Sequence, residues 1–435
     1  MPPDAGAPPL APGAAAALAD LVAAYAARRS GWDADSPVRV IEAETLVAGR
    51  PGLLDVVAQV GDRPTHITFG LRDPGEDGRP AGDGDDSVIG VFDDGDGAAV
   101  VVDAMHDPVT ATVLLRRVSG EEVDPSLVRP VHEDHTSVTL AMEDRLAFTL
   151  YNHVLEGPRP EIEMFLALDE SGFNHLAAPV GVWRRSGRDL GLVQEYLPGA
   201  SSGYALAMTS VRDLYASGGP PELAGGDFGA EAHRLGTMTA RMHLSLDKAF
   251  GRRSGDLAQW ARDIEHVLEE LDPGAGERPD VEQLLHELRA LQVPSQAIRS
   301  HGDFHLDRTC RTEQGWYVVD FAAGGFPTSV AGAVAPPDAR GPVFRSPVAD
   351  VADMLWSFGY VARRAADERD PSGHDGLSEL ADAWEERNRR AFLAGYLGVP
   401  GISGLVPPGR EALRVLTRSF EVVREAVHES RLRQA

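Results

Sequence analysis

The order of apolar and polar positions divides the chain into a β-rich first part and a helical second part. Short apolar runs separated by Gly and Pro predict strands at residues 38–47, 53–60, 65–71 and 99–103. Asp107 and Pro108 then form the start signal of a helix that we expect to reach Arg117. We expect the preceding strands to form a separate N-terminal subdomain, the cap, at residues 1–106.

An acidic segment interrupts this strand pattern. Residues 73–97 hold nine carboxylates and one Arg among many glycines, a composition that cannot bury enough apolar surface to become ordered. We therefore expect a mobile, solvated loop. Asp93, Asp94 and Asp96 resemble calcium ligands in type, but their spacing and the missing downstream Glu do not fit an EF-hand loop.

A small sheet with one helix packed on it is predicted for residues 107–197. Its strands are expected at 136–142, 145–151, 180–185 and 189–196. Glu143 and Asp144 would form a tight turn between the first two strands, and a helix would begin near Glu161. Residues 198–435 are mainly helical, with helices expected at 204–216, 228–246, 255–272, 280–291, 347–365, 376–397 and 409–432 and a short strand at 316–320. The predicted fold class is α+β.

Charge and cysteine content limit the partners and the compartment. Asp and Glu number 67 against 41 Lys and Arg, and the resulting net charge of −26 disfavours nucleic acid and anionic membranes as partners. The single cysteine, Cys310, allows no intrachain disulfide, as suits a reducing compartment. We find neither a membrane-spanning apolar run nor the basic start of an export signal. We expect a cytoplasmic monomer or homodimer with a small-molecule partner.

Two carboxylates stand where phosphoryl-transfer chemistry would need them. Asp303 lies in the segment His301-Gly302-Asp303-Phe304-His305, and Asp320 follows seventeen residues later at the end of the strand WYVVD. Phosphoryl transfer needs one carboxylate to orient and deprotonate the attacking hydroxyl and another to hold the metal that bridges the phosphates. The pair therefore predicts a phosphotransferase. The alternative is that both are ordinary turn acids that cap a hairpin.

The HGDFH segment, followed by a strand that ends in Asp320-Phe321, resembles the catalytic segment of the aminoglycoside phosphotransferase-like kinases. The wider sequence resembles the bacterial maltokinase-like group. Supporting segments are 193–199, which resembles the hinge between two lobes, and 234–236, 242–243, 346–355 and 392–396. The resemblance covers about residues 130–430. It implies a bilobal, protein-kinase-like α+β fold with the cap, an N-lobe at 107–197 and a helical C-lobe at 198–435.

The resemblance also implies roles for particular residues. Asp303 would be the catalytic base and Asp320 a ligand of Mg²⁺. Asp350 would brace the catalytic loop together with His301, although Asp350 could simply cap its helix and His301 could be a packing residue. The hinge residues that would hold the adenine of ATP are Gln194, Glu195 and Leu197.

Two positions depart from the family pattern. The fifth residue after the base is usually Asn or Gln and binds the second metal, but here it is Arg308, whose guanidinium has no lone pair for a cation. Asp307 or His305 could take that role. The phosphate-binding Lys is also missing, since Thr149 stands in its place and no Lys occurs from 1 to 247.

The missing Lys has consequences for the nucleotide. Its expected partner, Glu163, then has no obvious ion pair. The phosphates would be held by backbone amides and metal, with the Glu143-Asp144 turn as the nucleotide loop, or nucleotide affinity would be weak. A catalytically inactive relative remains an alternative.

The last predicted helix carries the strongest indication of the acceptor. Glu421, Glu425 and Glu429 repeat every four residues and share a face. That face is either solvated and salt-bridged, since Arg418, Arg424 and Arg431 lie among the glutamates, or it is a wall of the acceptor site. A carboxylate there would bind the ammonium of an amino sugar through a charge-assisted hydrogen bond.

We therefore expect an ATP-dependent kinase that converts glucosamine to glucosamine 6-phosphate, since the resembled group includes actinobacterial glucosamine kinases. Maltokinase is the second choice, followed by an aminoglycoside phosphotransferase and a nucleotide-free scaffold. Trp356, Trp384 and His428 are candidate sugar contacts, although each could equally lie in the core.

Overall fold

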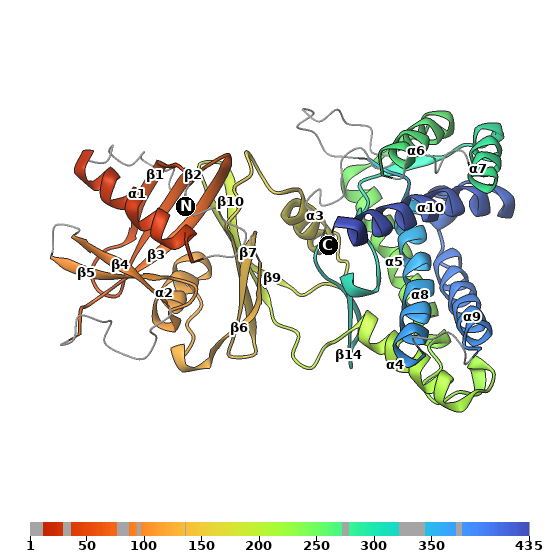
Figure 1. Cartoon of the computed structure of the whole chain (residues 1–435), viewed down its shortest axis with the longest axis horizontal. Coiled ribbons are helices and arrows are strands. Elements are labelled where there is room, and N and C mark those ends of the chain that lie inside the picture. The colour runs from red at the N-terminus through yellow and green to blue at the C-terminus, as the bar shows by residue number, and fades with distance from the viewer. Residues whose placement is uncertain are drawn as a thin grey trace. The chain divides into compact units, whose positions relative to one another are not determined.

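The computed structural model describes residues 12–28, 36–75, 87–93, 97–134, 136–271, 278–321, 344–370 and 376–434. The chain forms two compact units (Figure 1). The first comprises Met1–Ile162 and Ala177–Pro198, and the second comprises Glu163–Leu176 and Gly199–Ala435. The cap and the N-lobe, which we predicted as separate domains, therefore lie in one unit, whereas residues 163–176 belong with the helical part.

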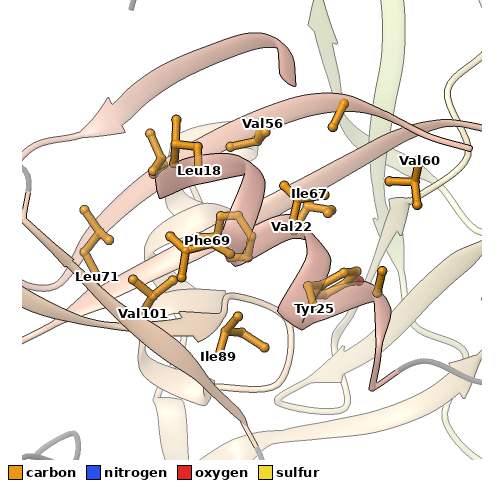
Figure 2. Packing of buried hydrophobic residues seen from close by; sticks show 14 of the residues in the cluster. Leu18, Val22, Tyr25, Val56, Val60, Ile67, Phe69, Leu71, Ile89 and Val101 are labelled. Carbon is orange, nitrogen blue, oxygen red and sulfur yellow. The ribbon is translucent and has the colours of Figure 1, made fainter. Parts of the chain in front are cut away.

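The cap is an antiparallel sheet covered by one helix. Its elements are α1 (Pro12–Ala26), β1 (Val38–Val47), β2 (Gly52–Val60), β3 (Arg63–Arg72), β4 (Val88–Asp93) and β5 (Ala98–Asp103), and the strand order is β1-β2-β3-β5-β4. Leu18, Val22 and Tyr25 of α1 pack onto Ile67 and Phe69 of β3 in the buried core of this sheet (Figure 2).

The strand β4 corrects the prediction of a loop over residues 73–97. Val88–Asp93 pairs with β5 as an edge strand, and Ile89 is buried in the cap core. The short apolar run VIGVF can pair with the neighbouring Val-rich strand even though acidic residues surround it. Asp93 lies on this strand, whereas Asp94, Asp96 and residues 76–86 lie outside the described residues.

The N-lobe is a second antiparallel sheet of five strands. Its elements are α2 (Pro108–Ser119), a 3₁₀ turn (Pro125–Leu127), β6 (Val128–Glu133), β7 (Ser137–Met142), β8 (Leu146–Tyr151), β9 (Pro179–Arg185) and β10 (Arg188–Glu195), in the order β6-β7-β8-β10-β9. Glu143 and Asp144 have φ values of 56° and 47°, and the Arg145 N–H donates to the Met142 carbonyl at 3.1 Å. This is the tight turn expected from the sequence.

Helices dominate the second unit. They are α4 (Gly203–Ser217), α5 (Gly229–Phe250), α6 (Leu257–Leu271), α7 (Pro279–Ala290), α8 (Pro347–Arg369), α9 (Ser378–Leu397) and α10 (Arg410–Gln434), with α3 (Pro160–Glu170) lying mostly in this unit. Short strands are β11 (Ser201–Ser202), β12 (Arg252–Ser254), β13 (Gln296–Ile298), β14 (Thr309–Thr312) and β15 (Gly315–Val318), and short 3₁₀ turns are Pro221–Leu223, Leu306–Arg308 and Ile402–Gly404.

The helix α8 organises this unit, because it contacts α4, α9 and α10 and buries one residue after another along its length. The loop that carries Asp303 connects β13 to β14, and it meets the first turn of α8. A membrane-crossing helix is absent from the part of the chain that the structure describes, since none of its helices is both long and apolar enough.

Candidate active site

The loop His301–His305 is anchored on the first turn of α8. The buried carboxylate of Asp350 accepts hydrogen bonds from the backbone N–H groups of His301 at 2.8 Å and Gly302 at 2.9 Å. It also contacts His243 Nε2 at 3.0 Å. Burial alone would raise the pKa of Asp350, but His243 and the loop amides hold it below its ordinary value. The N-cap of α8 is Ser346, so Asp350 serves the loop rather than the helix end.

Glycine is required at the second position of this loop. Gly302 has φ +90°, and a Cβ there would lie 3.0 Å from Nη1 of Arg345. The same nitrogen donates to the Gly302 carbonyl at 3.1 Å. A larger residue would be strained and would push Arg345 away from the loop.

Asp303 is a buried carboxylate with several cationic neighbours. Arg424 Nη1 on α10 donates to its Oδ1 at 2.5 Å, and Arg308 Nη2 donates to Oδ2 at 3.2 Å. His305 Nε2 lies 3.5 Å from the same Oδ2. Burial by itself would raise the pKa of Asp303, but His305 and Arg424 together hold it far below its usual range. Asp303 is therefore ionised at neutral pH.

Asp320 shares a guanidinium with Asp303. It follows β15 with a φ of 52°, and its side chain is 70% exposed. Arg308 Nη1 lies 3.3 Å from Asp320 Oδ2, while Nη2 contacts Asp303. The structure thus brings the two predicted carboxylates to the two sides of Arg308. Asp307, the residue before Arg308, is exposed.

The donor set around Arg308 suits a hard divalent cation. No group of three or more His, Cys, Asp or Glu side chains in the described ranges is arranged to hold a metal by itself. Mg²⁺, however, is usually bound by only one or two carboxylates together with phosphate oxygens and water. The exposed Asp320 carboxylate meets that requirement, and Asp307 offers a second oxygen donor nearby in the sequence.

His301 is a neutral residue of the loop interior. Its ring lies 5.0 Å from that of Phe321 and 5.2 Å from that of Phe304. Burial lowers its pKa to about 4. Its Nδ1 accepts from the Asp303 N–H at 3.4 Å, so the ring helps to fix the backbone beside the carboxylate.

The predicted nucleotide residues lie in the first unit. Gln194 and Glu195 end β10, where the N–H of Glu195 donates to Ala178 at 2.9 Å. In the described part of the chain the N–H of Leu197 has no hydrogen-bond partner. Thr149 on β8 shares a hydroxyl–hydroxyl hydrogen bond of 2.9 Å with Thr139.

Glu163, which the sequence left without a partner, is paired with an arginine instead of a lysine. Arg299 Nη1 lies 2.7 Å from Glu163 Oε2. Arg299 is buried two residues before His301, and its guanidinium lies 4.1 Å from the centre of the Phe250 ring. The ion pair therefore ties α3 to the strand that leads into the Asp303 loop.

The three glutamates of α10 have three different environments. Glu421 is only 3% exposed and binds Arg389 at 2.5 Å and Arg418 at 3.4 Å. Glu429 lies 3.8 Å from Arg433 at the exposed end of the helix. Glu425 is half-buried, and the described residues offer it no ion pair. The only α10 side chain known to reach Asp303 within the described chain is Arg424, a cation.

The aromatic candidates for sugar contacts also lie in different environments. Trp384 is 2% exposed and donates from Nε1 to Ser210 at 3.0 Å, so it lies in the core of the second unit. His428 is half-buried and packs against Trp356 and Tyr360 with ring centres 5.1 and 4.8 Å away. Arg424 lies 5.2 Å above the Trp356 ring. Trp356 and His428 therefore adjoin the residue that binds Asp303.

Three residues of this site were not found by sequence reasoning. They are Arg345, Asp353 and Arg424. Each interacts electrostatically with Asp303 or Asp350. Arg424 had been assigned only to a solvated helix face. Only Asp353 could have been noticed in the sequence. It lies one helical turn after Asp350 in a mostly apolar helix, and acids on a buried helix face are rare.

Comparison with known proteins is in line with this geometry. Residues 128–325 match the phosphotransferase enzyme family, APH. A glucosamine kinase from Streptacidiphilus jiangxiensis is 34% identical over 258 residues, which cover 54% of this chain and 53% of that protein. The matched region thus spans about half the length of this curated relative.

Solved structures of glucosamine kinases resemble the whole chain. A complex with glucosamine, ADP and inorganic phosphate has a TM-score of 0.64 at 25% identity and covers 95% of this chain and 94% of its own. Another crystal form has a TM-score of 0.64 at 25% identity, with 98% and 95% covered. The resemblance expected from the HGDFH segment is confirmed. Residues 128–325 thus match the phosphotransferase enzyme family, and the chain has the α+β, kinase-like bilobal fold.

Proposed function

We propose that the protein is an ATP-dependent kinase that phosphorylates glucosamine, giving glucosamine 6-phosphate. The observation that carries the proposal is the buried, ionised Asp303, held by Asp350 in a loop of a phosphotransferase-family domain. The choice of acceptor is supported by the likeness to glucosamine kinases in both sequence and structure.

Asp303 acts on the attacking hydroxyl of the sugar. Its carboxylate accepts the hydroxyl hydrogen bond and receives the proton as the phosphoryl group is transferred. Asp350 and His301 keep the loop backbone in place, so the carboxylate does not need to reorganise during the reaction. Because its pKa is strongly depressed, Asp303 contributes more by orienting the hydroxyl than by early deprotonation.

Asp320 holds Mg²⁺, with Asp307 or His305 as the further ligand. When bound, the ion would supply positive charge that stabilises the transferred phosphoryl group. Asp307 is the better second ligand, because Mg²⁺ prefers oxygen donors and His305 Nε2 already faces Asp303. Arg308 replaces the usual Asn, and its guanidinium supplies positive charge for a phosphate oxygen.

The hinge holds the adenine of ATP through backbone groups around Gln194, Glu195 and Leu197. The N–H of Leu197 supports this assignment, since it has no hydrogen-bond partner among the described residues and can donate to a ring nitrogen. Thr149 occupies the place of the phosphate-binding Lys. The phosphates would therefore be held by backbone amides, with the Glu143-Asp144 turn as the nucleotide loop, and by the metal.

The acceptor lies against α10, where Glu425 is the glutamate best placed to bind an ammonium group. Glu421 is already paired with two arginines, and Glu429 lies near the end of the helix. His428 and Trp356 offer ring faces for the sugar. Trp384 lies in the core and cannot contact the sugar from there, so it contributes to the packing of the second unit.

Maltose remains the second candidate acceptor because of an aromatic surface beside Arg424. The rings of Trp356 and Tyr360 are stacked with centres 5.1 Å apart and an interplanar angle of 15°. His428 packs against both rings, and all three residues are partly exposed. Such a surface suits the apolar face of a second sugar ring.

One acceptor panel tests the proposal. Purified protein is given ATP and Mg²⁺ with glucosamine, glucose, maltose or kanamycin, and ADP release is measured. We expect the highest kcat/KM for glucosamine. Faster turnover of maltose or kanamycin would favour the corresponding alternative, and no acceptor-dependent ADP with any of them would favour a nucleotide-free scaffold.

A further inference from the structure

The acid Asp353, which lies near Asp303, is mostly buried and has no close ion pair among the described residues. Asp353 lies on α8 one turn after Asp350, and its side chain is 14% exposed. Its nearest cation is Arg424, with Nη1 4.0 Å from Oδ2. Within the described residues the Asp353 carboxylate accepts no hydrogen bond.

The neighbouring carboxylates are satisfied. Asp350 receives two backbone N–H groups and His243, and Asp303 receives Arg424 and Arg308. A buried carboxylate without donors is costly, so such a group in a native protein calls for an explanation. Of these three acids, Asp353 is the one that receives no hydrogen bond from the described residues, so its carboxylate can accept one from a ligand.

The charged groups around Asp353 limit what it can bind. Asp303, Asp350 and Asp353 share the buried guanidinium groups of Arg345 and Arg424, and Arg308 adds a third guanidinium at Asp303. Burial raises the pKa of Asp353 to about 8, and the nearby Asp303 and Asp350 add to the effect while the two arginines oppose it. The raised pKa means that the Asp353 carboxyl keeps its proton near neutral pH until a cation beside it favours the ionised form.

A cation that binds Asp353 must be small and rich in hydrogen-bond donors. An ammonium group carries one positive charge and three N–H donors, which matches a carboxylate without a hydrogen-bond partner. Arg424 Nη1 contacts both Asp303 and Asp353, at 2.5 and 4.0 Å. A cation at Asp353 would thus lie close to the carboxylate that meets the reacting hydroxyl.

We propose that Asp353 binds the ammonium group of the amino-sugar acceptor and so determines the preference for glucosamine over glucose. The proposal rests on the proposed function and extends it, because it adds a specificity-determining residue on α8 to the acceptor wall on α10. Asp353 acts by binding the substrate, and Asp303 remains the group that meets the hydroxyl.

The test compares Asp353→Asn with the parent on glucosamine and glucose. Asn keeps the shape of the side chain but removes its charge, so kcat/KM should fall far more for glucosamine than for glucose. The ratio of the two should drop at least tenfold, mainly through KM, as expected for a lost charge-assisted hydrogen bond. Asp353→Glu, which keeps the charge, should retain part of the preference.

Two further variants make the result specific. Asp367→Asn makes the same change at an exposed position of the same helix and should leave the ratio unchanged. Glu425→Gln tests the α10 glutamate separately. Folding of every variant is checked by thermal unfolding, and glucosamine binding to the nucleotide-free protein is measured by calorimetry.

Each outcome has a definite meaning. A parent that prefers glucosamine together with an Asp353→Asn variant that keeps this preference would overturn the inference and leave the proposed function intact. A parent without any preference for glucosamine over glucose would overturn both. If Asp353→Asn does not fold, the same loss of preference is expected for Asp353→Ser, and its absence would count against the inference.

Discussion

At the scale of single residues, two arginines contact carboxylates of the candidate site. Arg308 stands where Asn is usual and lies between Asp303 and Asp320. Arg299 takes the pairing with Glu163 that a lysine would make. Both guanidinium groups carry positive charge close to the Asp303 loop, where a lysine ammonium could not make the same paired contacts.

Thr149→Lys tests whether the phosphate site lacks only this charge. We expect kcat to change little and KM for ATP to stay equal or fall, because the new ammonium adds attraction to the phosphates. Thr149→Val is the control, since it also removes the hydrogen bond to Thr139 but adds no charge. A well-folded Thr149→Lys protein without activity would show that the threonine itself has a direct part in the reaction.

At the scale of elements, most helices and strands could be predicted from the sequence. The exceptions include strands that form only because they pair with a neighbouring strand. The edge strands β4 and β6 were missed because few of their residues are buried, and they acquire strand structure by pairing with β5 and β7. The HGDFH segment was recognisable because its residues are adjacent in the chain. Arg424 was not, since it reaches Asp303 across 121 residues through helix packing.

His106 provides a prediction about how two elements are joined. It follows β5 and contacts Asp103 at 3.0 Å and Glu133 on β6 at 2.9 Å. The hydrogen bond to Asp103 and the two negative charges raise its pKa to about 9. A raised folded-state pKa gives stability that is complete below the unfolded value of about 6.5 and is lost as the pH rises through 9.

The free energy of unfolding of His106→Gln should therefore differ most from that of the parent at pH 6, and the two should converge by pH 10. Urea unfolding across this pH range measures both. His132→Gln is the control, because His132 is an exposed histidine on β6 next to Glu133. Its free energy of unfolding should change with pH in parallel with that of the parent. A constant gap between parent and His106→Gln would show that the ion pairs do not depend on His106 protonation.

At the scale of the molecule, a buried ionic cluster explains why the cap and the N-lobe form one unit. Asp55 on β2 contacts His66 on β3 at 2.7 Å and also binds Arg185 on β9. His66 Nδ1 faces the Tyr151 carbonyl of β8 at 3.0 Å. The sequence could not reveal this link, because Asp55 and Arg185 are 130 residues apart and neither belongs to a recognisable motif.

Removing one member of this cluster should loosen the whole first unit. Arg185→Met leaves the buried Asp55 carboxylate without its guanidinium, and breaking a buried pair in this way costs about 3–5 kcal/mol. Hydrogen exchange should quicken in β2, β3 and β9 but not in α8. Arg39→Met, at an exposed site on β1, should have no such effect. Exchange unchanged by Arg185→Met would mean that the apolar core alone joins the two sheets.

The most direct test of the account is the turnover of Asp303→Asn with glucosamine, ATP and Mg²⁺. Asn preserves the shape of the side chain but cannot take the hydroxyl proton, so kcat should fall by roughly 10²–10⁴ while thermal unfolding stays close to that of the parent. Asp382→Asn on α9, an exposed acid of the same unit, should keep parental activity. A folded Asp303→Asn protein with kcat within a factor of about two of the parent would contradict the assignment of Asp303 as the group that acts on the acceptor.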